Sequence, residues 1–259
     1  MAVLPVSEGL KIMNKRSVLP NFFTLTNAFL GFLAIIYISQ EHYITAAWCI
    51  IFAAICDALD GKLARLSKTY SKFGTELDSL ADAVSFGVAP AFLVYETNFN
   101  TVGFWGAFFC FIFVLAGIFR LARFNITVNA YRKKKYKGLP IPVSALALST
   151  FFIMAQYFWD TLQMTPVLLV LVPGLSLLMV STVEYGPLPL LMVHRNYRKN
   201  ILPFVYIIGL ICVIINPRIW FFPWVMFYII SSLIKGIASK LREEDEDAEM
   251  VIEEKHILK

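Results

Sequence analysis

Charged residues are scarce in this chain. Only 16% of its 259 residues are Asp, Glu, Lys or Arg, whereas 58% are hydrophobic and the mean hydropathy is +0.68. Soluble domains carry about 25% charged residues. The composition therefore excludes an ordinary soluble protein and predicts an integral membrane protein, and the length fits one bundle rather than several domains.

Cysteine is also scarce, and its four positions lie singly within apolar stretches: Cys49, Cys56, Cys110 and Cys212. This scatter excludes a CxxC metal site and a disulfide framework of the secreted type. No cleavable leader is expected either. The first apolar run, 21–39, is longer than a typical signal-peptide core, so we expect it to be a retained helix.

Apolar segments of membrane-spanning length recur along the chain. A helical span needs roughly 20 mainly apolar residues. Eight segments qualify: 20–39, 43–66, 76–96, 101–124, 140–159, 165–183, 200–215 and 218–236. The seventh is short and the sixth contains Pro173 and Gly174, which leaves six to eight spans. We expect an all-α membrane bundle.

Three regions follow from this pattern. Residues 1–19 are expected to form an interfacial N-terminal segment, 20–236 the transmembrane domain, and 237–259 an acidic cytoplasmic tail. With eight spans, 22 of the 23 Lys and Arg residues fall on the side of the N-terminus, and only Arg218 falls on the other. The positive-inside rule then places both termini in the cytoplasm.

The net charge of +5 therefore reflects the topology, and we expect it to attract anionic lipid headgroups. The basic residues flank the predicted spans. Nucleic acid is therefore not an expected partner, whereas the lipid bilayer is.

Acidic residues gather where the second and third spans approach each other. Asp57, Asp60, Asp78 and Asp82 all lie within 26 residues of sequence that hydrophobic segments flank on both sides. Residues three and four apart share a helix face. Asp57, Asp60, Gly61, Ala64 and Arg65 therefore form one stripe, and Gly74, Asp78 and Asp82 form another. An antiparallel helix pair would bring the four carboxylates together.

Ionisable groups within a span usually face the protein interior and mark a functional site. Four carboxylates that repel one another need cations, and hard oxygen ligands suit Mg²⁺, Mn²⁺ or Ca²⁺. The guanidinium of Arg65 suits a phosphate. Close helix packing alone explains a glycine and alanine face, but it does not explain the aspartates.

A cation transporter is an alternative, because intramembrane carboxylates also bind transported ions. That class predicts acids spread through the membrane depth and discontinuous helices near the midplane. The aspartates of this chain cluster toward one side, which favours an enzyme.

The spacing of the two stripes is D-x2-D-G-x2-A-R-x8-G-x3-D-x3-D, from Asp57 to Asp82. It resembles the signature of the CDP-alcohol phosphotransferase family at every fixed position. The resemblance implies a helical membrane bundle, usually a homodimer, with an active site open to the cytoplasm. It also implies transfer of a phosphatidyl or similar group from a CDP-linked donor to an alcohol, with release of CMP.

The resemblance further implies roles for individual residues. Asp57, Asp60 and Asp78 would hold metal, and Asp82 would complete a site for two Mg²⁺ or Mn²⁺ ions and act as the general base. The CDP group would be bound by Asp57, Asp78, Gly61, Ala64, Arg65 and Gly74. The opening LPNFFTLTN resembles the PNxxT segment of bacterial members, in which Asn21 and Thr24 would approach the nucleotide.

A second stretch, FRLARFNI at 119–126 followed by GLPIP at 138–142, resembles the serine-using members of the family. It implies CDP-diacylglycerol and L-serine as substrates, phosphatidylserine and CMP as products, and a prokaryotic inner membrane as location. Arg120 and Arg123 would bind the serine carboxylate or the lipid phosphate, and Asn125 would hydrogen-bond the acceptor.

Considered without the resemblance, Arg120 and Arg123 are helix anchors at the headgroups. Other acceptors, namely glycerol 3-phosphate, inositol phosphate or choline, stay open. So does an ether-lipid donor of the archaeal type.

Overall fold

The computed structural model describes residues 18–67, 72–130, 136–185 and 202–257. The expected interfacial segment 1–19 lies outside this part except for the first residues of α2. Nine α-helices are described: α2 (Val18–Ser39), α3 (Tyr43–Ser67), α4 (Lys72–Asp82), α5 (Ala89–Val94), α6 (Phe104–Ala130), α7 (Ile141–Trp159), α8 (Thr165–Val180), α9 (Leu202–Ile215) and α10 (Pro217–Ile257).

Among the described residues, six helical segments are long and apolar enough to cross a membrane: Asn21–Ser39, Tyr43–Leu63, Phe73–Val102, Phe104–Ile126, Ile141–Trp159 and Pro217–Lys240. Thr165–Val180 and Phe204–Ile215 are shorter apolar helices. Together they occupy the eight predicted spans, so the expectation of an all-helical multi-pass membrane protein is confirmed.

The third of these segments is not one regular helix. The π-helical turn η2 (Ala83–Val88) follows α4, and a second π-helical turn, η3 (Tyr95–Phe99), and a 3₁₀ turn, η4 (Asn100–Val102), follow α5. A π turn makes i→i+5 hydrogen bonds, and such turns frequently occur at functional sites. Here η2 begins directly after Asp82, and its residues Ser85, Phe86 and Gly87 are buried.

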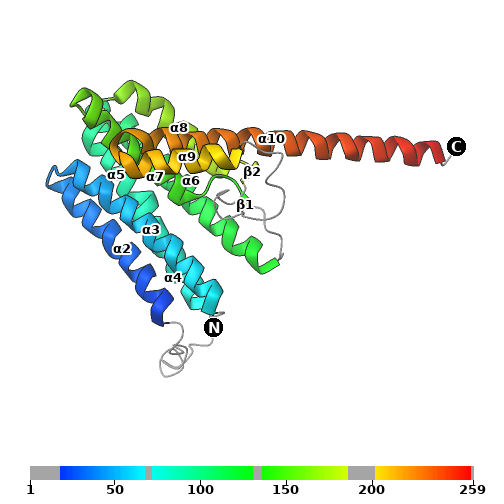
Figure 1. Ribbon diagram of the computed structural model, residues 1–259, viewed down its shortest axis with the longest axis horizontal. Coiled ribbons are helices and arrows are strands. Elements are labelled where there is room, and N and C mark those ends of the chain that lie inside the picture. Colours follow the sequence, from blue (N-terminus) through cyan, green and yellow to red (C-terminus); the bar gives the residue numbers. More distant parts are fainter. Residues whose placement is uncertain (1–17, 68–71, 131–135, 186–201, 258–259) are drawn as a thin grey trace.

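Helices α2 and α3 pack along each other as an antiparallel pair, joined by a tight turn in which Glu41 has φ of 63° (Figure 1). Small buried residues on these helices, Ala34, Ala46, Ala47 and Ala53, allow the close approach. Gly31 of α2 is required where that helix passes η2, because a Cβ there would contact Ser85 Oγ and lie 2.7 Å from Ser85 Cα.

A two-stranded antiparallel ladder joins the ends of α6 and α8. It consists of β1 (Tyr136–Lys137) and β2 (Glu184–Tyr185), and α10 packs against β2. Helix α10 then continues beyond the rest of the molecule to Ile257, as the orange-to-red helix of Figure 1 shows. The predicted acidic tail therefore has a helical backbone over most of its length.

Candidate active site

Three of the four predicted aspartates come together between α3 and α4. Asp57, Asp60 and Asp78 each offer one carboxylate oxygen, and these oxygens lie within 4.8 Å of one another. Asp78 Oδ1 is buried and has no hydrogen-bond partner among the described residues. Clustered carboxylate oxygens are the ligands that hard divalent cations prefer, so this trio fits such an ion.

Helix α2 supports the aspartates from the side. Thr24 Oγ1 donates a hydrogen bond of 3.0 Å to Asp60 Oδ2, and Asn27 Nδ2 donates one of 3.1 Å to Asp82 Oδ1. Ser85 Oγ in η2 donates to the backbone oxygen of Asn27 at 2.9 Å. One polar face of α2 therefore contacts aspartates from both α3 and α4.

Asp82 lies outside the trio of close oxygens. It is buried, and the charges of Asp57 and Asp78 act on its carboxyl group. The resemblance implies roles for Asn21 and Thr24 but not for Asn27, which is fully buried beside Asp82. The spacing gave a signal, because positions 21, 24 and 27 recur every three residues within an apolar helix.

The structure describes the side chains of only some of the residues that were predicted to bind the nucleotide. Gly61 is half-buried, and its backbone N–H binds the Asp60 carboxylate. Gly74 is half-buried near the start of α4, and Asn21 is half-buried on α2. The side chains of Ala64 and Arg65 lie outside the described part of the structure, as do those of the basic run 132–137.

Among the side chains that the structure describes, Arg120 of α6 supplies a positive charge beside the aspartates. Its side chain is 8% exposed, and its guanidinium lies over the ring of Phe124, 5.3 Å from the centroid. Its charge acts on the carboxyl groups of both Asp57 and Asp82. This placement differs from that of a headgroup anchor, which would extend toward solvent.

Arg123 and Asn125, one turn further along α6, have other contacts. Arg123 donates to three successive backbone carbonyls at the end of α8: Nη2 to Met179 O at 3.2 Å, Nη1 to Val180 O at 2.9 Å and Nη2 to Ser181 O at 3.0 Å. Asn125 Nδ2 donates to Ser79 Oγ in α4 at 3.0 Å. Arg123 thus fixes the end of α8, and Asn125 connects α6 to α4.

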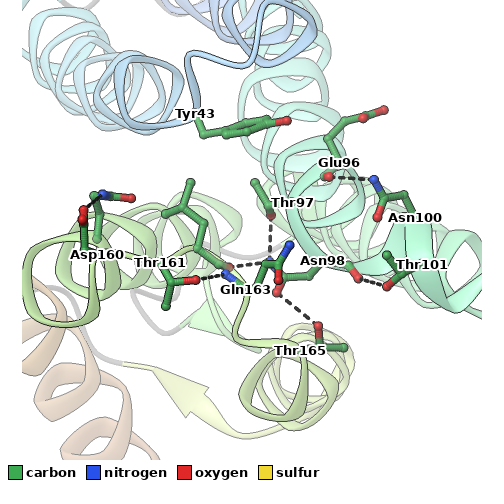
Figure 2. A pocket seen from close by; sticks show the side chains of 12 residues that line it. Tyr43, Glu96, Thr97, Asn98, Asn100, Thr101, Asp160, Thr161, Gln163 and Thr165 are labelled. Atoms are coloured by element: carbon green, nitrogen blue, oxygen red, sulfur yellow. Dashed lines mark hydrogen bonds between the residues drawn. The ribbon is translucent and has the colours of Figure 1, made fainter.

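A cavity of about 490 Å³ lies at the opposite end of the bundle, where α3 and α8 begin. Figure 2 shows the polar side chains that line it. Asn98 uses both ends of its amide there: Nδ2 donates to Leu162 O at 2.9 Å, and Oδ1 accepts from Met164 N at 2.7 Å. These bonds hold the α7–α8 connection against η3, which gives Asn98 a structural role.

Comparison with known proteins identifies the family of this chain. Residues 17–182 match the model of the family described as CDP-alcohol phosphatidyltransferase. A CDP-diacylglycerol–serine O-phosphatidyltransferase of Helicobacter pylori is 37% identical over 174 residues, which cover 67% of this chain and 73% of the relative. A protein of the same name from Methanocaldococcus jannaschii is 33% identical over 217 residues, 84% of this chain and 93% of the relative.

A third relative has a different name. The archaetidylserine synthase of Methanothermobacter thermautotrophicus is 34% identical over 171 residues, which cover 64% of this chain and 69% of that protein. The family match includes α2, the aspartates of α3 and α4, and Arg120. The resemblance noted in the sequence is thereby confirmed, and the chain belongs to the CDP-alcohol phosphatidyltransferase family.

Proposed function

We propose that this enzyme transfers the phosphatidyl group of CDP-diacylglycerol to the hydroxyl of L-serine, giving phosphatidylserine and CMP. The observation that carries the proposal is the convergence of Asp57, Asp60 and Asp78 beside the buried cation Arg120. The names of the relatives from H. pylori and M. jannaschii support serine as the acceptor.

Asp57, Asp60 and Asp78, with Asp82, are the residues that would hold two Mg²⁺ or Mn²⁺ ions. When bound, such ions neutralise the diphosphate of the donor and stabilise the charge that develops on the leaving group. Thr24 holds the Asp60 carboxylate through Oδ2, which restricts how that carboxylate turns.

The CDP group is bound along α2, α3 and α4. Asn21 and Thr24 approach the nucleotide from α2, and Asp57 and Asp78 lie beside it. Gly61, Ala64 and Gly74 leave room next to the backbone, and the guanidinium of Arg65 pairs with a phosphate. The lipid tails enter from the bilayer.

Asp82 acts as the general base in this proposal. Asn27 occupies Asp82 Oδ1, which leaves Oδ2 to accept the proton of the serine hydroxyl. The serine oxygen then attacks the phosphorus of the phosphatidyl group. The bond from that phosphorus to the bridging oxygen breaks, and CMP leaves with the electron pair.

Arg120 binds the negatively charged part of the acceptor or donor. Asn125 supports the site through α4, and Arg123 supports it through the end of α8. We further propose a homodimer in a prokaryotic inner membrane, with the aspartates facing the cytoplasm, where CDP and serine are soluble.

The test is CMP release from CDP-diacylglycerol by the purified protein with Mg²⁺ or Mn²⁺, with and without L-serine. We expect release that depends on both serine and the metal. Glycerol 3-phosphate, inositol phosphate and choline serve as comparison acceptors. Release with one of these and none with serine would overturn the assignment of serine but not that of the family.

An ether-lipid donor is a second candidate, favoured by the similarity to an archaetidylserine synthase. The acceptor chemistry is the same and only the lipid tails differ. The same assay with ester-linked and ether-linked CDP-lipids decides between them through the ratio of kcat/KM for the two donors.

A further inference from the structure

Phe124 of α6 is the aromatic residue that contacts the buried arginine of the site. It follows Arg120 by four residues, so the two side chains lie on the same face of the helix. Arg120 Cζ lies over the Phe124 ring, 5.3 Å from its centroid, which is within the roughly 6 Å at which a ring face attracts a guanidinium. The resemblance implies roles for the polar residues of FRLARFNI but none for this phenylalanine.

Arg120 does not extend to the headgroups, as arginines near the end of a span usually do. It lies near the end of the span that finishes at Ile126, yet its side chain is only 8% exposed. Taking a charge out of water is costly unless other groups compensate for it. The ring of Phe124 supplies part of that compensation, because its attraction for a cation is stronger where water is excluded.

The contact with a ring face differs from an ion pair in what it leaves for a ligand. A ring attracts the guanidinium as a cation and accepts none of its N–H groups in the plane of the fork. These in-plane donors are the groups that pair with a carboxylate or a phosphate. A carboxylate in the place of Phe124 would instead bind the same donors. An aromatic residue therefore holds the arginine without competing with an anionic substrate.

The residues on either side of Phe124 fix its backbone. Arg123 Nη1 donates to Val180 O at the end of α8 at 2.9 Å, and Asn125 Nδ2 donates to Ser79 Oγ of α4 at 3.0 Å. Helix α6 is therefore connected to α8 and to α4 at this turn. The fold sets the position of the Phe124 ring, and the long, flexible arginine side chain is the partner that the ring holds in place.

We propose that Phe124 is a positioning residue, whose ring holds the guanidinium of Arg120 inside the bundle and so prepares it to bind the anionic group of a substrate. That group is a carboxylate or a phosphate, since both match a guanidinium. The carboxylate is that of L-serine, and the phosphate is that of CDP-diacylglycerol. The inference rests on the proposed function, from which it takes the role of Arg120.

The test measures CMP release by Phe124→Leu, which removes the ring but keeps an apolar side chain. We expect kcat/KM to fall about 2–30-fold, the range that the loss of one cation–π contact gives. A fall through the KM for L-serine identifies the carboxylate as the ligand, and a fall through the KM for CDP-diacylglycerol identifies the phosphate. Phe124→Tyr keeps the ring face and should retain the parent values. Phe124→Met also lacks a ring and replaces the leucine variant if that protein does not fold.

A double-mutant cycle with Arg120→Gln separates positioning from a general effect on the fold. If the ring acts through the guanidinium, Phe124→Leu lowers kcat/KM no further once the guanidinium is absent. Losses that add in the double variant would overturn the inference.

Phe119→Leu is the matched control, because it makes the same change on α6 at a side chain that is 53% exposed. It should leave both KM values unchanged. Unchanged kinetics in a folded Phe124→Leu protein would also overturn the inference. A parent chain that shows no serine-dependent release would overturn the proposed function instead, so the two failures are distinguishable.

Discussion

At the scale of single residues, Asp82 is the aspartate whose surroundings differ from those of the rest. One of its oxygens is held by Asn27, and it lies outside the trio of close carboxylate oxygens. We predict that Asp82→Asn lowers kcat by about 10²–10⁴, the usual contribution of a general base, and changes CDP-diacylglycerol binding little. Asp57→Asn should instead weaken the binding of Mn²⁺ and of the nucleotide together.

Turnover and equilibrium binding of the CDP-lipid, measured on the same preparations, separate the two effects. Glu76→Gln is the control, since Glu76 is exposed on α4 and should tolerate the change. Mild and equal effects at positions 57 and 82 would contradict the roles assigned to both.

We expect Thr24 to influence metal binding indirectly, through the carboxylate of Asp60. Removing its hydroxyl in Thr24→Val takes away the donor to Asp60 Oδ2. Groups that support a metal ligand are worth about 10–100-fold in affinity. We therefore predict that Mn²⁺ binding, measured by titration calorimetry, weakens about tenfold.

Thr26→Val provides the comparison for this change. Within the described part of the chain, the Thr26 hydroxyl bonds to Phe22 O of its own helix at 2.8 Å and to no residue of the site. If both valine variants bind Mn²⁺ as tightly as the parent chain, the Thr24–Asp60 bond does not support the metal.

The residues of the site differ in how far sequence predicts them. The meeting of Asp57, Asp60 and Asp78 follows from helical periodicity and a short connection between two helices. The partners of Arg123 are backbone carbonyls 56–58 residues away. Every residue offers a carbonyl, so no side-chain pattern singles out these three. Such contacts depend on tertiary packing and cannot be predicted from spacing.

At the scale of elements, the close approach of α2 to η2 positions Asn27, the residue that donates a hydrogen bond to Asp82. Gly31 allows that approach, and Ser85 in η2 holds the backbone of Asn27. We predict that Gly31→Ala destabilises the protein by about 1–3 kcal/mol, as overpacking of a core does, and lowers turnover because Asn27 shifts relative to Asp82.

Gly174→Ala in α8 is the matched change, since among the described residues no atom outside its own helix backbone lies within 4 Å of the added Cβ. It should be neutral or stabilise α8 by about 0.5–1 kcal/mol. Thermal unfolding in detergent measures the change in stability, and CMP release measures the change in turnover. Equal behaviour of the two alanine variants would show that the contact between α2 and η2 is not needed.

Hydropathy predicts the helices but not their internal irregularities. The third span was expected at 76–96, whereas the structure has Phe73–Val102 with two π turns and a 3₁₀ turn. A π turn depends on what packs around it, here the backbone of α2 at Gly31 and Asn27. Apolar composition is the same for α- and π-helical backbone, so the sequence pattern contains no signal for it.

At the scale of the whole molecule, the two ends of the bundle differ in charge. The connections at the end with Tyr43, Asn98 and Thr165 carry acidic residues such as Glu41 and Asp160. On the positive-inside rule, which counts Lys and Arg, we propose that this end lies outside the cytoplasm and the aspartate site faces it. The proposed orientation would let CDP and serine reach the site directly.

We predict that cysteines introduced at Glu41 and Asp160 react with a membrane-impermeant maleimide on intact cells. A cysteine at Lys137 in β1, on the aspartate side, should react only after the membrane is opened. The parent chain gives the background from its four native cysteines, of which Cys110 is buried and the others are half-buried. Labelling of position 137 on intact cells, with positions 41 and 160 protected, would invert the topology.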